Sequence, residues 1–101
     1  MIPEILRYQV PAAQAEAFEQ AYARAGDSLK QSPHCQGFEL LRSDKDPELY
    51  LLKILWDSAD GHLQGFRKSE QFKAFFEQIR IYLPHLLEME HYRATGLEWQ
   101  R

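Results

Sequence analysis

The sequence predicts an α+β protein with the ferredoxin-like order β-α-β-β-α-β, in which helices cover one face of an antiparallel sheet. Apolar runs separated by residues typical of turns predict the strands, and apolar residues at helical spacing predict the helices. The segment 49–56, LYLLKILW, is the most informative, because only Lys53 interrupts the apolar character of its two faces. A strand of this kind must be covered on both faces. Since so short a chain has helices for one face only, we expect a second subunit on the other, giving a homodimer.

The first half of the chain predicts one strand and one long helix. Ile2 to Val10 contains side chains that favour strands. Pro11 suits the first turn of a helix, and that helix is expected to continue to about Lys30. Its apolar stripe repeats at helical spacing and consists of Phe18, Tyr22, Ala25 and Leu29.

The next segments predict a β-hairpin. Phe38 to Arg42 and Glu48 to Trp56 read as strands, and the residues between them, Ser43 to Pro47, are typical of a turn. Two strands joined by a short turn pair naturally as antiparallel neighbours.

The last part of the chain predicts two helices and a final strand. Ser58 can cap a short helix over 59–66, and Ser69 can cap a second. The second helix has an apolar stripe and is expected to end or kink at Pro84. A final strand is expected within Leu87 to Ala94.

Composition narrows the classes of function. A length of 101 residues predicts a single domain over 1–101. The net charge of −3 and the lack of a basic cluster argue against nucleic acid as a partner. No apolar run is long enough for a membrane span, and the first ten residues do not resemble a signal peptide. The single cysteine, Cys35, excludes an internal disulfide and favours a cytoplasmic location.

Several residues resemble a known family. The segments Ile54 to Ser58 and Ser69 to Phe72, with the order of the elements, are similar to the antibiotic biosynthesis monooxygenase domains of the dimeric α+β barrel superfamily. The resemblance implies two subunits with their sheets face to face and a pocket between sheet and helices in each. Members include oxygenases that oxidise phenols with O₂ and no metal or flavin, and heme-degrading monooxygenases.

The resemblance also implies two catalytic residues. Trp56 matches the tryptophan that lines the pocket in both oxygenase groups, and His62 falls where phenol-oxidising members can carry a tyrosine that binds the substrate. A neutral imidazole can accept a phenolic proton near pH 7. We therefore expect His62 to accept or hold that proton and Trp56 to stack against the aromatic ring.

Four further residues are expected in the substrate pocket. Leu52 falls where a phenol oxidase can carry an asparagine, and Arg7 lies near the position of an asparagine in heme-degrading members. Phe76 falls where those members place the histidine that ligates iron. Phe72, one helical turn before Phe76, would help to make the pocket narrow and apolar.

The sequence leaves three functions open. The first is a monooxygenase without a cofactor that oxidises a small quinol or phenol. The second is a dimer without enzymatic activity that binds a hydrophobic small molecule. The third is a heme-binding or heme-degrading protein, which a phenylalanine at position 76 disfavours, because it cannot ligate iron. The four histidines show no close ligand spacing, so no metal site is predicted.

Overall fold

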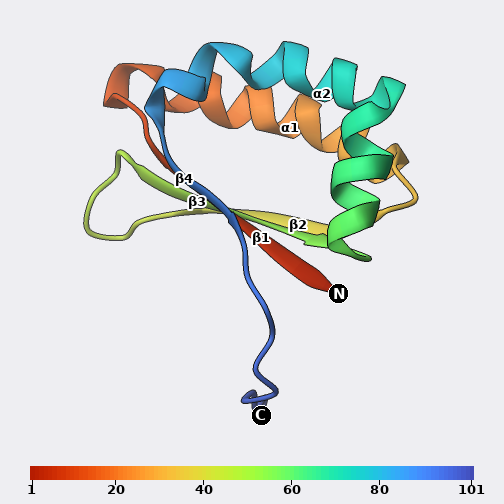
Figure 1. Ribbon diagram of the computed structural model, residues 1–101. Coiled ribbons are helices and arrows are strands. Elements are labelled where there is room, and N and C mark those ends of the chain that lie inside the picture. The colour runs from red at the N-terminus through yellow and green to blue at the C-terminus, as the bar shows by residue number, and fades with distance from the viewer.

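The computed structural model describes residues 1–101 and contains one four-stranded antiparallel sheet with both long helices on the same face (Figure 1). The strands are β1 (Ile2–Gln9), β2 (Cys35–Arg42), β3 (Leu49–Trp56) and β4 (Leu86–His91), and the helices are α1 (Ala15–Gln31) and α2 (Glu70–Ile79). The strand order β2-β3-β1-β4 confirms the predicted ferredoxin-like fold. None of the helices has the length and the apolar character that a membrane crossing requires.

The core lies between the sheet and the two helices. It is formed by the inward side chains of β1 and β3 and by the predicted apolar stripe of α1, together with aromatic side chains of the second half of the chain. Its largest fully buried side chains are Trp56, Tyr8, Phe18, Phe66, Leu29, Leu52, Ile54 and Val10. Burial of these apolar surfaces is the main force that holds the helices on the sheet.

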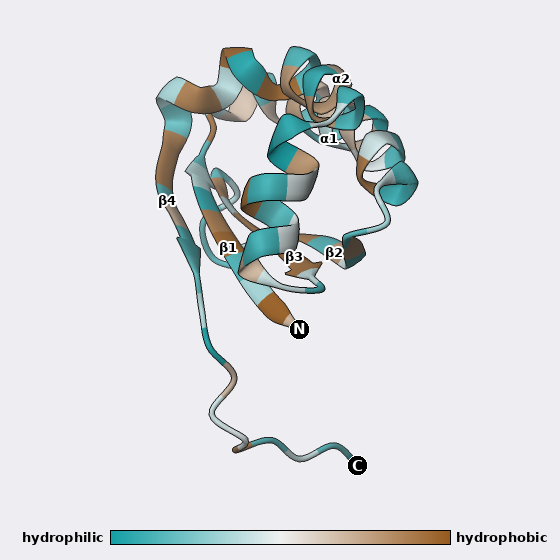
Figure 2. Ribbon diagram, turned by 45° about the vertical axis from the view of Figure 1, so that its right-hand side comes forward, coloured by the Kyte–Doolittle hydropathy of each residue, from teal (hydrophilic) through white to brown (hydrophobic).

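The boundaries of three elements differ from the predictions. β2 begins at Cys35, earlier than the predicted Phe38, because its backbone pairs with the end of β3 through an irregularity between Cys35 and Gly37. β4 ends at His91, and the residues that follow extend away from the sheet (Figure 2). Pro84 does not end α2 directly, since α2 is followed by 3₁₀ turns over Arg80–His85 that contain this proline.

The face of the sheet opposite the helices carries many apolar side chains. Leu51 and Leu55 of β3 and Ile5 of β1 are only half-buried there, and Leu41 of β2 is exposed. No element of the chain covers this face, as the bare underside of the sheet in Figure 1 shows. The structure thus has the apolar outer face that the sequence of β3 indicates.

Candidate active site

A wide helical turn after β3 places His62 over the sheet. Gly61–Gly65 forms a π-helical turn where an ordinary helix was predicted. Ser58 caps it as expected, because its Oγ accepts a hydrogen bond of 2.8 Å from the backbone N–H of Gly61. π-Helical turns are rare and occur frequently at functional sites.

Two glycines allow this turn to pack closely on the loop before β2. A Cβ atom at Gly61 would lie 1.9 Å from Oδ1 of Asp57, and one at Gly65 would lie 2.4 Å from Nε2 of His34. His34 and Asp57 are themselves joined by a hydrogen bond of 2.9 Å. A side chain at either position would therefore force His34, Asp57 or the turn itself to move.

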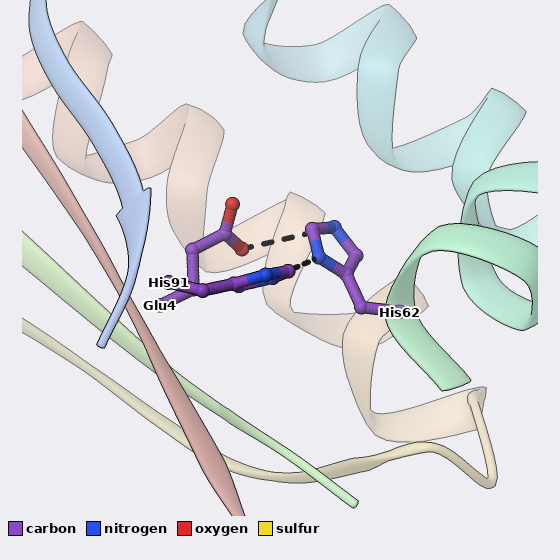
Figure 3. Close-up of side chains that lie close together, drawn as sticks. All are labelled: Glu4, His62 and His91. Atoms are coloured by element: carbon purple, nitrogen blue, oxygen red, sulfur yellow. Dashed lines mark hydrogen bonds and ion pairs between the residues drawn. The ribbon is translucent and has the colours of Figure 1, made fainter. Parts of the chain in front are cut away.

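Three titratable side chains meet below this turn (Figure 3). Glu4 comes from β1, His62 from the π-helical turn and His91 from the end of β4. Nδ1 of His62 and Nε2 of His91 are 2.7 Å apart, so one of the two rings donates a hydrogen bond to the other. Nε2 of His62 lies 3.8 Å from Oε1 of Glu4. Glu4 and His62 are buried, and His91 is partly exposed.

Trp56 contacts both buried members of the cluster, Glu4 and His62. Its indole N–H donates a hydrogen bond of 3.0 Å to Oε1 of Glu4. Its ring stacks on the imidazole of His62, with 4.3 Å between the ring centroids and 7° between the planes. Trp56 therefore fixes both the carboxylate and the imidazole, and its own face is taken by His62.

Burial sets the protonation of the two inner groups. It lowers the pKa of His62 to about 4, and the electrostatic effects of Arg67 and His91 act in the same direction. His62 is therefore neutral at pH 7 and able to accept a proton. Burial raises the pKa of Glu4, against the opposing effect of the hydrogen bond from Trp56.

An apolar cavity of about 210 Å³ opens beside this cluster. Glu4, His62 and Arg67 are the acidic and basic residues of its lining, and the other side chains are mainly hydrophobic. Those hydrophobic side chains are Leu6, Tyr8, Ile54, Trp56, Phe66, Phe72, Phe75, Phe76, Ile79, Leu83, Leu86 and Met89. A cavity with this lining suits a small, flat, apolar molecule that has one polar group.

The structure brings four of the six predicted site residues together. His62, Trp56, Phe72 and Phe76 all line this cavity. The other two do not. Leu52 is fully buried and lies on the inner face of β3 away from this cavity, near β2 and α1.

Arg7 lies on the opposite face of the sheet. Its side chain forms an ion pair of 2.8 Å with Glu88. Neighbouring residues of a strand point to opposite faces, so Arg7 points away from the cavity while Leu6 and Tyr8 line it.

Sequence reasoning missed Glu4, His91 and Arg67. For Glu4 a signal was available, because it shares the inward face of β1 with Leu6 and Tyr8, and a carboxylate on an apolar face usually has a specific partner. His91 could not be found in this way. Its proximity to His62 depends on the pairing of β4 with β1, which the sequence spacing of the histidines does not show.

The fold and the site define an α+β sheet protein with an apolar cavity and a polar cluster beside it. The family model for antibiotic biosynthesis monooxygenase matches residues 1–78. The chain therefore belongs to the antibiotic biosynthesis monooxygenase family. No curated protein matches the chain.

Solved structures with the same fold agree with this assignment. A protein of Bordetella bronchiseptica assigned to the antibiotic biosynthesis monooxygenases is 25% identical, with a TM-score of 0.80, and the match covers 93% of this chain and 96% of that one. A variant of SnoaB, a cofactor-independent oxygenase from Streptomyces nogalater, is 20% identical, with a TM-score of 0.77 and coverage of 94% and 90%. A related protein of Caulobacter crescentus is 23% identical, with a TM-score of 0.76 and the same coverage of 94% and 90%.

Proposed function

We propose that this protein is a cofactor-independent monooxygenase that oxidises a small quinol or phenol with O₂. The observation that carries the proposal is the position of neutral, buried His62 at the polar end of the apolar cavity. The ring of the substrate would occupy the apolar part of the cavity, and its hydroxyl group would meet His62. SnoaB, which shares the fold, is a cofactor-independent oxygenase.

The proposed reaction begins with the transfer of the phenolic proton to His62. A base with a pKa of about 4 holds a proton weakly, so the proton must move on. The hydrogen bond between His62 and partly exposed His91 supplies a path toward solvent. Arg67, whose side chain also lines the cavity, would stabilise the phenolate.

The phenolate then transfers electrons directly to O₂. Oxidation of a phenol C–H to a quinone carbonyl releases four electrons, which is the number that O₂ needs to give one product oxygen and one water. The substrate therefore supplies all the reducing power. His62 and His91 only move protons, and Trp56 holds His62 in position.

A heme function has less support. The cavity of about 210 Å³ lies below the roughly 300–1,000 Å³ of sites for drug-sized ligands, so it does not fit a heme macrocycle. Phe76 lines this cavity and offers no ligand for iron.

The proposal includes a homodimer formed through the open face of the sheet. The apolar side chains of β3 on that face support it, because a stable protein rarely leaves a contiguous apolar face in water. A cytoplasmic location is proposed with it, on the evidence of the single cysteine.

Oxygen uptake is the direct test. The purified protein, kept in chelator, should consume O₂ faster than the compounds do alone when it is mixed with some members of a panel of benzene and naphthalene diols, and mass spectrometry should find quinone products with one more oxygen atom than the diol. Binding of these compounds without any O₂ consumption would favour the alternative, a non-enzymatic binder of hydrophobic small molecules. A failure to bind any of them would contradict both.

A further inference from the structure

We propose that Glu4, His62 and His91 form a binding site for one divalent transition-metal ion of the class of Zn²⁺ and Co²⁺. One ligand atom from each of the three side chains lies within 4.8 Å of the other two (Figure 3). The residues are 58 and 29 positions apart along the chain (62 − 4 and 91 − 62), so no short sequence motif indicates the site. It exists only because β1, the π-helical turn and β4 meet at one place.

The donor set suits these metals. Two imidazole nitrogens and one carboxylate oxygen are the ligands of many catalytic zinc sites, and related sets hold cobalt, nickel and ferrous iron. Three protein ligands leave at least one coordination position open. Because Glu4 and His62 both line the cavity, the open position would face the space where a small molecule can enter.

The distances require only small side-chain movements. Ligand atoms about 2.0–2.1 Å from a tetrahedral metal lie roughly 3.3 Å from one another. The two histidine nitrogens are now 2.7 Å apart and would separate by roughly half an ångström as a metal replaces the proton between them. The longer separations, up to 4.8 Å, would shorten, and the partly exposed ring of His91 has room to move.

The environment of His62 and Glu4 favours the binding of a metal ion by these side chains. His62 is buried, with Nδ1 2.7 Å from Nε2 of His91 and Nε2 3.8 Å from Oε1 of Glu4. The carboxyl group of Glu4 is buried too, and a metal would balance its charge. The indole N–H of Trp56 already donates to Glu4, as second partners do around ligating carboxylates.

Metal binding would have a consequence for the proposed oxygenase. The metal would take the nitrogens through which His62 and His91 are proposed to pass a proton. The protein with a metal bound should therefore not catalyse the proposed oxidation, which itself uses no metal. This consequence rests on the proposed function, whereas the binding itself does not.

Co²⁺ alone is the probe that tests the site. Titration of the full chain, after treatment with chelator and removal of the chelator, should give a visible absorption band that saturates at one Co²⁺ per chain and disappears when Zn²⁺ is added. His91→Ala and Glu4→Gln should each weaken Co²⁺ binding at least about tenfold. His85→Ala is the matched control, because His85 is partly exposed but lies outside the cluster, and it should bind as the original protein does.

Circular dichroism shows whether each variant is folded. If Glu4→Gln does not fold, His91→Ala alone tests the site. The proposal is overturned if Co²⁺ gives no saturable band, or if folded His91→Ala binds it with unchanged affinity. Neither result bears on the oxygenase, whose own assay is performed in chelator. If the protein consumes no O₂, the Co²⁺ titration still tests the metal site, because metal binding does not depend on the oxygenase activity.

Discussion

The indole of Trp56 and the imidazole of His62 lie face to face, 4.3 Å apart and nearly parallel. The same indole donates a hydrogen bond to Glu4 on β1. Trp56 thus connects the end of β3 to the two buried titratable groups beside the cavity. His62 therefore occupies one face of the ring that the sequence predicts to stack on a substrate.

Replacing Trp56 by phenylalanine should therefore affect both stability and activity. Phenylalanine leaves a void and removes the donor to Glu4, so we expect the free energy of unfolding to fall by about 2–4 kcal/mol. His62 would lose part of its support, and O₂ uptake should slow. Trp99→Phe is the control, because Trp99 is 76% exposed and should change neither quantity. Urea unfolding that gives equal stabilities for the two variants would contradict this role of Trp56.

The glycine at position 61 should be required for the position of His62. A Cβ atom there would collide with the carboxylate of Asp57, so Gly61→Ala must displace either that side chain or the turn. We expect a loss of stability of about 1–3 kcal/mol and slower O₂ uptake. Gly37→Ala has room for its Cβ, whose nearest neighbour beyond the adjacent residues is 3.9 Å away, and should be close to neutral. Thermal unfolding of both variants checks the prediction, and similar midpoints would refute it.

The lowered pKa of His62 should make stability depend on pH. The unfolded chain binds a proton at this residue below about pH 6.5, whereas the folded protein does so only near pH 4. The unfolded state therefore gains protons first on acidification, and the free energy of unfolding should fall by up to about 3 kcal/mol between pH 6.5 and 4.

Glu4 must be removed to see this effect alone. Its raised pKa acts in the opposite sense, because the folded protein holds that proton longer as the pH rises. The measurement is urea unfolding at several pH values in Glu4→Gln, compared with the double variant Glu4→Gln, His62→Phe. The free energy of unfolding should change less between pH 6.5 and pH 4 in the double variant than in Glu4→Gln. Equal changes would show that His62 is not the group responsible.

The open face of the sheet should hold the dimer together. Leu51→Glu places a charge on this face, and we expect it to convert a dimer of twice 11.9 kDa to a monomer. Ile81→Glu is the matched control, because Ile81 is 66% exposed in the turns after α2 and should leave the mass unchanged. Light scattering measures both. A monomeric original protein at micromolar concentration would contradict the proposed dimer.

The fold was predictable because local patterns agree with the tertiary structure. The α1 stripe of Phe18, Tyr22, Ala25 and Leu29 is buried as its spacing predicts. Ser58 caps the π-helical turn and Ser69 caps α2, as expected. The spacing of apolar residues and the capping of helices depend on neighbours close in the chain, which a single sequence displays directly.

The site was predictable only in part. His62, Trp56 and Phe76 could be found from the resemblance, and Phe72 from the apolar stripe of its helix. Arg7 was assigned to the pocket from its approximate position on the first strand. A shift of one residue along a strand moves a side chain to the other face of the sheet, and Arg7 lies on the face opposite the helices. The partnership of Glu4, His62 and His91 depends on strand pairing and on a π-helical turn, and neither has a strong local signature.

The rate of O₂ uptake by His62→Gln tests the central claim most directly, since glutamine keeps polarity but cannot act as a base. With the best diol substrate in chelator, we predict a loss of at least about a hundredfold in kcat relative to the original protein. His85→Ala, measured in parallel, should keep the original rate. If folded His62→Gln consumes O₂ as fast as His85→Ala, His62 is not the base and the account of the site is wrong.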